Sequence, residues 1–388
     1  MPKFSRRLPP HADLNALAHA LARAGAAGMA VVDLTESNPT RAGIAYPPDL
    51  LRGLAGEAAL RYEPHALGLP SAREAVARDH ARRGVSLDPG RIVLTASTSE
   101  AYSWLFKLLC DPGESVLVPR PSYPLFEHLA RLEGVTTIPF ELEYHGRWTI
   151  DVASLAAAPA DARAVIVVSP NNPTGSYLSA RDLQQVSALC RDRGWALIVD
   201  EVFGDYSLEA DAPPTDIAAR SDVLAFTLGG LSKSAGLPQL KLGWIVVGGP
   251  PEAREAALAG LELIADTFLS VATPVQLAAA DLLESATAIR TRIHERVRAN
   301  LAALRDAARP FAACEVLRTE GGWSAVIRVP ATRGEEQLVL DLLEHEGILV
   351  HPGYFFDFQR EAFVVVSLLP RPDVFREASM RLLRFASS

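Results

Sequence analysis

Short runs of hydrophobic residues recur through the middle of the chain, with helical patterns between them. The runs lie at residues 92–94, 116–118, 165–168, 197–199, 223–226 and 244–247. They show no strict alternation with polar residues, so each run is predicted to be a strand that is covered on both faces. The pattern therefore predicts an α/β fold in which a mostly parallel sheet lies between helices.

Helix-start signals stand between these runs. Residues 99–109 begin with Ser99 and residues 179–193 begin with Ser179, and serine is a residue type that caps the first turn of a helix. Open α/β sheets bind ligands at the carboxyl ends of their strands. The loops that follow the predicted strands are therefore where functional residues are expected.

A long helical pattern from about residue 260 to 308 ends before Pro310 and leads into a second unit. Strands of that unit are predicted at residues 325–329, 348–350 and 363–366. The expected division of the chain is an N-terminal arm with part of the small domain over 1–45, a large domain over 46–285 and a small C-terminal domain over 286–388.

Charge and composition exclude several classes of protein. The chain of 388 residues has 38 Lys and Arg against 46 Asp and Glu, a formal net charge of −8. Nucleic-acid binding needs a clustered basic face, and the longest basic cluster, Lys3 with Arg6 and Arg7, is expected to be a solvated tail. No nucleic-acid partner is therefore expected. Hydrophobic residues at 49% and charged residues at 22% indicate a globular protein with a large core.

The cysteines and histidines suggest neither disulfides nor a metal site. Cys110, Cys190 and Cys314 are odd in number and far apart, which fits a protein of the reducing cytoplasm. The nine histidines are scattered and form no familiar ligand motif. We therefore expect no bound metal.

An alanine-rich stretch at residues 14–32 resembles a secretory signal only at first sight. His19 and Arg23 interrupt its apolar run, so it is interpreted as an amphipathic helix with Asp13 near its start. No run in the chain approaches the ~18 apolar residues that a membrane span needs. No membrane association is expected.

Charged residues stand at or just after the ends of two predicted strands. Lys233 lies in a loop of small residues, 228–234, where burial would lower the pKa of its amine and leave a nucleophile for Schiff-base chemistry. The alternative is an exposed loop lysine. Asp200 and Glu201 end another strand, and successive strand residues face opposite ways, so one of the two is expected to enter a site. A carboxylate buried there needs a cation or a donor.

Two further stretches carry polar groups after strands. Residues 169–175 contain Asn172 and are either a ligand-binding loop or an ordinary turn. Ser97, Thr98 and Ser99 stand between a strand and a helix, where hydroxyls and unpaired amides form either a phosphate cradle or a plain helix cap. Together the four stretches supply an amine, a carboxylate, an amide and an anion cradle. This combination indicates a functional site more strongly than any one of the stretches does.

These stretches resemble the pyridoxal-phosphate enzymes of fold type I, specifically the class I/II aminotransferases related to aspartate aminotransferase. The resemblance covers nearly the whole chain and includes Tyr62 with Gly68 and Arg73, Pro121-Ser122-Tyr123-Pro124, Glu320-Gly321-Gly322-Trp323, Gly347 and Pro352-Gly353-Tyr354-Phe355-Phe356. It implies a large domain with a mostly parallel seven-stranded sheet between helices, plus a smaller α+β domain. It also implies pyridoxal 5′-phosphate as the cofactor.

The resemblance assigns roles to the residues at the strand ends. Lys233 would carry the cofactor as an internal aldimine and later move a proton between the substrate α-carbon and the cofactor. Asp200 would pair with the pyridine nitrogen and keep the ring an electron sink. Tyr123 would stack on the ring, and Asn172 would bind the phenolic oxygen and lie close to the substrate carboxylate.

The same resemblance assigns the cofactor phosphate and the oligomeric state. Ser97, Thr98, Ser99 and Ser232 would hold the phosphate through amides and hydroxyls. Tyr62 would reach the phosphate of the neighbouring subunit, which implies a homodimer with shared active sites.

Three positions depart from the family pattern. Phe203 stands where most relatives have a tyrosine, so one hydrogen bond to the phenolic oxygen is lost. Lys241 stands where relatives place an arginine on the phosphate, and it acts as a point charge without the bidentate fork. Val365 aligns with the arginine that clamps the substrate carboxylate, so the usual clamp is absent.

A substitute for that clamp is sought among the remaining arginines. Arg41 follows Ser37-Asn38-Pro39 in a segment that matches a family loop lining the active site, so these residues are predicted to bind substrate with Asn172. Arg371 is the second candidate. For each arginine the alternative is an ordinary surface position.

The predicted function is that of a cytoplasmic, homodimeric aminotransferase of amino acid metabolism. It would move an amino group from an L-amino acid to a 2-oxo acid by a ping-pong mechanism. The alternatives are β-elimination or decarboxylation on the same cofactor, because the absent clamp affects which substrate bond stands perpendicular to the ring. A non-catalytic ligand sensor is a further alternative. It is disfavoured, because such a sensor would need a DNA-binding module and the resemblance to the aminotransferases begins within the first few dozen residues.

Overall fold

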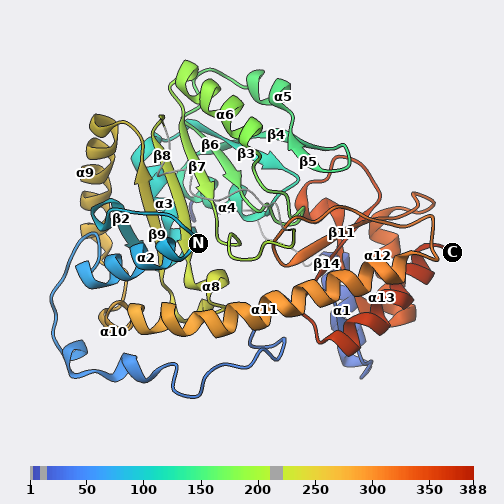
Figure 1. Ribbon diagram of the computed structural model, residues 1–388. Helices are drawn as coiled ribbons and strands as arrows, with labels where there is room; N and C mark the ends of the chain where they lie inside the picture. The colour runs from blue at the N-terminus through green and yellow to red at the C-terminus, as the bar shows by residue number, and fades with distance from the viewer. Residues whose placement is uncertain (1–2, 9–14, 210–221) are drawn as a thin grey trace.

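The computed structural model describes residues 3–8, 15–209 and 222–388. Its central sheet has eight strands in the order β2-β9-β8-β7-β6-β3-β4-β5 (Figure 1). The strands are β2 (Ile92–Thr95), β3 (Ser115–Arg120), β4 (Thr136–Tyr144), β5 (Trp148–Ile150), β6 (Ala164–Val168), β7 (Ala196–Asp200), β8 (Ala225–Gly230) and β9 (Gly243–Gly248). β9 and β5 run antiparallel to their neighbours, and the other strands share one direction.

The predicted mostly parallel sheet is thus confirmed, with one strand more than the seven expected. The extra strand is β5, three residues that pair back onto β4 at the edge of the sheet. β4 was missed by the hydrophobic pattern because its residues are mostly half-buried or exposed. A strand whose faces are only partly covered does not form a continuous apolar run.

Helices cover both faces of the sheet, as the apolar strands require. On one face lie α3 (Thr98–Leu109), α4 (Leu125–Glu133) and α9 (Pro251–Phe268), and on the other lie α5 (Val152–Ala156) and α6 (Ala180–Arg193), with α2 (Pro70–Arg82) and α11 (Ala279–Ala308) nearby (Figure 1). Successive side chains of β7 point to opposite faces of the sheet. Ile198 packs on the face that α3 covers, whereas Leu197 and Val199 pack on the face that α6 covers. Each face therefore has its own hydrophobic cluster.

The predicted start of α6 at Ser179 is confirmed, whereas α3 starts earlier than predicted, with Ser97 rather than Ser99 as its cap. The hydroxyl of Ser97 accepts a hydrogen bond from the N–H of Glu100, and that of Ser179 accepts one from the N–H of Asp182. The predicted helix at residues 14–32 is α1 (Ala16–Ala26), and its cap is Asn15. Asp13, the predicted start, lies outside the described residues.

The long helical pattern at residues 260–308 contains a break. α9 ends at Phe268, Leu269 adopts a left-handed backbone conformation, and α10 (Thr273–Leu277) precedes α11. α11 ends at Ala308, before Pro310 as predicted. It runs from beneath the sheet into the second unit (Figure 1).

The second unit is built on a small antiparallel sheet in the order β10-β11-β14-β13. Its elements are β1 (Val32–Asp33), β10 (Glu315–Val316), β11 (Ser324–Arg328), α12 (Glu335–Glu346), β12 (Ile348–Leu349), β13 (His351–Pro352), β14 (Phe363–Ser367) and α13 (Pro372–Ala386), with α1 beside them. β1 pairs in parallel with β12. The shortest helices are η1 (Arg52–Ala55), η2 (Glu57–Leu60), η3 (Pro89–Arg91), α8 (Leu231–Ser234), η4 (Pro238–Leu240) and η5 (Gly353–Phe356).

Side chains of α11 hold the chain just beyond β14. The amide of Asn300 donates to the carbonyls of Leu368 and Pro370 at 2.8 and 2.7 Å, and Arg296 donates to the carbonyl of Leu369 at 3.0 Å. The helix thereby fixes the strand that carries Ser367.

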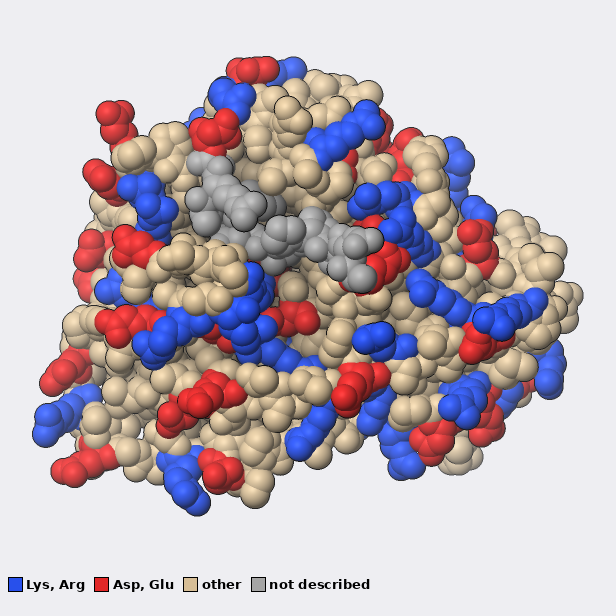
Figure 2. Space-filling view, in the orientation of Figure 1, with Lys and Arg blue, Asp and Glu red and all other residues tan. Residues whose placement is uncertain are grey.

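The surface, the helices and the metal-ligating residue types add three general observations. On the face seen in Figure 2, acidic and basic side chains are interspersed. Within the described ranges, none of the helices combines the length and the apolar character needed to cross a bilayer. The same ranges contain no group of three or more His, Cys, Asp or Glu side chains arranged to hold a metal ion.

Candidate active site

The carboxyl ends of five parallel strands, β2, β3, β6, β7 and β8, open onto one cavity of about 190 Å³. The segments that follow these strands carry most of its walls, and the second unit closes one side. The lining residues are Ser37, Ser97, Thr98, Ser99, Tyr123, Phe126, Val168, Asn172, Asp200, Val202, Phe203, Gly230, Ser232, Lys233, Leu242, Trp323, Ser324 and Ser367. The predicted amine, carboxylate, amide and hydroxyl cluster therefore meet in one place.

Lys233 enters the cavity from α8, directly after β8. Its amine lies 5.6 Å from the ring centre of Phe203 and 5.2 Å from that of Trp323. Burial lowers the pKa of this amine below its usual value, and the charge of Asp200 opposes the shift. Because the proton is held less tightly, the neutral, nucleophilic form is more available than in an exposed lysine.

Asp200 is the last residue of β7 and is 8% exposed. Its carboxylate accepts hydrogen bonds from the Tyr102 hydroxyl at 3.0 Å and from the Val202 N–H at 3.1 Å. Burial raises the pKa of this carboxyl to about 6, although both hydrogen bonds and Lys233 act in the opposite direction. A cationic ligand group would make the site complete, since the existing donors do not offset the burial.

The next residue, Glu201, lies on the opposite side of the sheet. Its carboxylate forms an ion pair with Arg83 of α2 at 3.9 Å. The prediction that one of the two acidic residues enters the site is confirmed, and the alternation of strand residues is the reason.

The amino end of α3 supplies the hydroxyl cluster. Ser97 caps the helix, and Thr98 and Ser99 are its first two residues, whose N–H groups have no acceptor within the helix. Positive helix-dipole charge gathers at the same point, which favours an anion. The hydroxyl of Ser97 is bonded to the N–H of Glu100 at 3.2 Å. Ser97 therefore serves as a helix cap as well as a wall of the cavity.

The two neighbouring asparagines after β6 have different surroundings. Asn171 is buried, accepting from the Ser122 hydroxyl at 2.8 Å and donating to the Pro121 carbonyl at 3.1 Å, so it holds the loop together. Asn172 lines the cavity, and its side-chain oxygen lies 3.3 Å from the Ser324 hydroxyl of β11. Asn172 is thus the one available to a ligand.

Four predicted residues do not line the cavity in this single chain. Tyr62 is 77% exposed and borders a separate hollow. Lys241 is exposed on the loop before β9. Arg41, with a side chain 73% exposed, pairs with Glu36 at 3.0 Å. Asn38, although beside Ser37, accepts bonds from Thr40 instead.

Val365, the predicted position of the family's carboxylate-binding arginine, is buried in the apolar core. It packs with Trp148, Val326 and Phe356, away from the cavity lining. Arg371, the second arginine considered, precedes α13 and pairs with Asp373 at 2.9 Å.

Several lining or supporting residues were not assigned from sequence. Tyr102 lies one helical turn after Thr98 on α3, and that spacing is a signal for a side chain on the same helical face. Ser324 and Ser367 come from β11 and β14 of the second unit. They are brought to the cavity by tertiary packing alone, so no local pattern identifies them.

The chemistry of the cavity follows from these groups. It offers a nucleophilic amine, a buried carboxylate that needs a cation, and an anion cradle at a helix start. A ligand with a carbonyl carbon, a protonated ring nitrogen and a phosphate would satisfy all three. Phe203, Trp323 and Phe126 provide apolar walls against a ring.

Comparison with known proteins points to one family. The model of the family Aminotransferase class I and II matches residues 12–373. The chain is 27% identical over 376 residues to the glutamate-pyruvate aminotransferase AlaA of Haemophilus influenzae, covering 93% of this chain and 91% of that protein. It is 30% identical over 371 residues to the alanine aminotransferase of Mycobacterium bovis, covering 90% of this chain and 84% of that one.

Solved structures show the same architecture. An aminotransferase from Mycobacterium tuberculosis superposes with a TM-score of 0.84 at 25% identity, over 100% of this chain and 99% of that chain. The alanine aminotransferase from Pyrococcus furiosus also gives 0.84, at 22% identity and 95% coverage of each chain.

We expect Asp200→Asn to remove a pH dependence from the stability of the ligand-free protein. The folded pKa of about 6 exceeds the ordinary 3.8, so Asp200 favours the fold when protonated, and this contribution is lost as the pH rises from about 4 to about 6. Relative to the variant, the parent should lose on the order of 3 kcal/mol across that range, at about 1.36 kcal/mol per pKa unit. Denaturant unfolding at a series of pH values measures the difference. Parallel stability curves for the two proteins would contradict the assignment.

Proposed function

The chain belongs to the class I and II aminotransferases, and on that premise we propose that it transfers an amino group from an L-amino acid to a 2-oxo acid by a ping-pong mechanism centred on Lys233. The observation that carries the proposal is the buried Lys233 amine in a cavity it shares with Asp200 and the amino end of α3. The fold is that of the fold type I enzymes, and the cofactor of the family is pyridoxal 5′-phosphate. The names of the relatives make alanine, glutamate and pyruvate the first substrates to test.

The residues present fit this cofactor. Asp200 is a buried carboxylate whose pKa burial raises despite two hydrogen bonds and the charge of Lys233, and a protonated pyridine nitrogen is a cation that would offset this burial. Ser97, Thr98 and Ser99 form the anion cradle that a phosphate needs. When bound, the cofactor supplies an aldehyde that accepts the amino group and a ring that draws electrons from the substrate α-carbon.

Each side chain then has a defined task. Lys233 would hold the cofactor covalently through Nζ, and its lowered pKa leaves that amine free to take and return a proton at the substrate α-carbon. Asp200 would keep the ring nitrogen protonated. Tyr123, 44% exposed, would cover one face of the ring, and Asn172 would donate to the ring oxygen. The aromatic rings of Phe203 and Trp323 exclude water beside the amine.

The phosphate would bind Ser97, Thr98, Ser99 and Ser232. Ser232 lines the cavity one residue before Lys233. Lys241 would contribute through its charge over a longer distance, because it is exposed outside the cavity lining. A mobile ammonium at that range is weaker than a bidentate arginine.

The substrate carboxylate would lie on the side of Ser37 and Asn172, next to the hydroxyls of Ser324 and Ser367. These groups are neutral donors. Arg41 is the cation of the same loop, and a substrate carboxylate would have to compete with Glu36 for it.

A second copy of the chain would complete the site. Tyr62 borders a hollow of about 170 Å³ with Trp104 and Leu269. Around this region the chain exposes large apolar side chains: Leu60 at 86%, Phe268 at 50%, Leu277 at 38% and Leu269 at 37%. Exposed apolar surface of this kind marks an interaction face. A homodimer would bury it and bring Tyr62 toward the neighbouring phosphate.

We expect the parent enzyme, given an amino acid donor without an acceptor, to release one 2-oxo acid per bound cofactor and then stop, as a ping-pong transfer requires. Lys233→Ala should lower the rate at least about a thousandfold, because no other lysine lines the cavity. Borohydride reduction of the parent followed by peptide mapping should mark Lys233. Continuous release of ammonia or carbon dioxide would favour elimination or decarboxylation instead. A mark on another lysine would contradict the role of Lys233.

We expect Arg41→Ala to raise the KM for the amino acid about tenfold or more while changing kcat less, because it removes a cation from the carboxylate side of the site. Arg309→Ala is the matched control, since Arg309 is similarly exposed, at 80%, and pairs with the exposed Asp306 at 2.8 Å. Steady-state kinetics with one donor and one acceptor measure both. An unchanged KM for the Arg41 variant would contradict the role of Arg41 and would indicate that the neutral donors bind the substrate carboxylate.

We expect shared active sites to show complementation between inactive variants. Lys233→Ala and Tyr62→Ala homodimers should both be impaired. After mixed refolding, half of the dimers are hybrids with one intact site each, so about a quarter of the parent activity should return. Activity no higher than the mean of the two separate variants would contradict sharing through Tyr62.

A further inference from the structure

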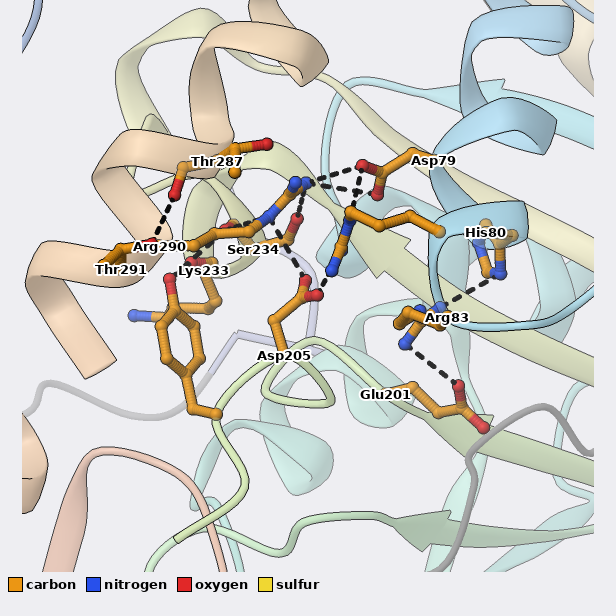
Figure 3. A network of polar contacts seen from close by, with 12 residues as sticks. Asp79, His80, Arg83, Glu201, Asp205, Lys233, Ser234, Thr287, Arg290 and Thr291 are labelled. Atoms are coloured by element: carbon orange, nitrogen blue, oxygen red, sulfur yellow. Dashed lines mark hydrogen bonds and ion pairs between the residues drawn. The ribbon is translucent and has the colours of Figure 1, made fainter. Parts of the chain in front are cut away.

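A buried charged network lies behind the Lys233 segment, outside the cavity (Figure 3). At its centre is Arg290 of α11, which is 6% exposed. Its guanidinium forms ion pairs with Asp79 of α2 at 3.0 Å and with Asp205 at 3.6 Å. Arg82 pairs with the same two carboxylates. Two positive and two negative groups thus balance one another, with Arg290 and both carboxylates buried and Arg82 at the edge of the network, 38% exposed.

Arg290 also binds the chain beside the catalytic amine. Its Nε donates to the Ser234 carbonyl at 3.0 Å, and a terminal nitrogen donates to the Ser234 hydroxyl at 3.0 Å. A second donor acts on the same segment: the Tyr206 hydroxyl lies 2.8 Å from the Lys233 carbonyl and 3.2 Å from the Ser234 carbonyl. The backbone oxygens of both residues are therefore held by side chains from elsewhere in the fold.

This support matters because the lysine stands on a very short helix. α8 has four residues, Leu231–Ser234. The Lys233 carbonyl also accepts a hydrogen bond from the Gly236 N–H, at 3.2 Å. The outside donors add to this backbone contact and further limit how far the backbone that carries Lys233 can shift. The donors come from α11 and from the loop after β7, which are themselves fixed by packing and by the charged network.

We propose that Arg290 and Tyr206 are positioning residues for the transfer reaction, which hold the carbonyls of Lys233 and Ser234 from behind so that the Lys233 amine stays aimed into the cavity. The proposal rests on the proposed role of Lys233. Neither residue lines the cavity, so both act through the backbone rather than by contact with substrate.

The chemistry of arginine explains the choice of residue at position 290. A planar guanidinium can bind a carbonyl, a hydroxyl and a carboxylate at fixed angles at the same time. Lysine would keep the charge for Asp79 and Asp205 but would lose this fork. Arg290→Lys therefore separates the positioning contact from the charge balance.

The test compares Arg290→Lys and Tyr206→Phe with the parent in two ways. The chain has four lysines, Lys3, Lys107, Lys233 and Lys241, so an amine-reactive label can be followed at each by peptide mass spectrometry. The first measurement is the pH profile of labelling at Lys233 in the cofactor-free protein. The second is kcat and KM of the loaded enzyme.

For Arg290→Lys we expect the labelling midpoint of Lys233 to rise by about half a pH unit or more, because a loosened amine reaches water and its burial weakens. We expect kcat to fall about tenfold or more while KM changes less than about threefold. Tyr206→Phe should also raise the labelling midpoint of Lys233 and lower kcat, by smaller amounts. Lys3 and Lys107 serve as internal references that should not change.

Arg333→Lys is the control for general effects of losing a partly buried arginine. Arg333 pairs with Asp341 at 3.5 Å in the second unit and has no contact with the Lys233 segment. It should match the parent in both measurements. A folded Arg290→Lys protein with the parent's Lys233 profile and kcat would overturn the proposal.

If Arg290→Lys does not fold, the test of the proposal is Tyr206→Phe. This substitution removes one hydroxyl group and keeps the ring that packs on Trp323. An unchanged Lys233 profile in that variant would overturn the proposal. Labelling is measured without cofactor, so it remains informative even if Lys233 turns out not to carry the reaction.

Discussion

The buried carboxylate of Asp200 is the constraint around which the active site is arranged. Placing an ionised group at the end of a central strand is costly unless donors or a cation accompany it. Tyr102 and the Val202 N–H supply two hydrogen bonds, and Lys233 supplies charge, yet the pKa remains raised. A cationic group of a ligand at this end of β7 would offset the remaining cost of burial. The same burial that raises the pKa of Asp200 lowers that of Lys233, so one apolar cavity prepares both groups.

The parallel sheet explains why these groups meet at all. Strands that run in one direction end at one edge, and here five of them deliver their following residues to a single cavity. α11 then ties the two walls together. Arg290 binds the Lys233 segment, while Asn300, further along the same helix, binds the chain after Ser367. Relative movement of the two walls is therefore resisted by one rigid element.

The strand ends and their reactive residues were predictable because they are encoded locally. An apolar run followed by Lys233 or Asp200, or by a helix cap at Ser97, is visible in a few consecutive residues. Ser324 and Arg290 were not predictable, because their partners Asn172 and Ser234 lie 152 and 56 residues away in sequence. Only tertiary packing brings them together. The proposed role of Tyr62 would depend on a second copy of the chain, which no local pattern describes.

The packing of Val365 shows why an arginine would be costly at this position. Along β14, Val364 and Val366 face the core formed with α11 and α13, whereas Val365 faces the opposite way. There it joins Trp148 of the central sheet to Val326 and Phe356 of the second unit. A guanidinium among these side chains would be buried without a partner, at a cost of several kcal/mol. The valine therefore provides apolar contact between the two units. If this is the position of the family's arginine, as predicted, the substrate carboxylate would have to bind other groups.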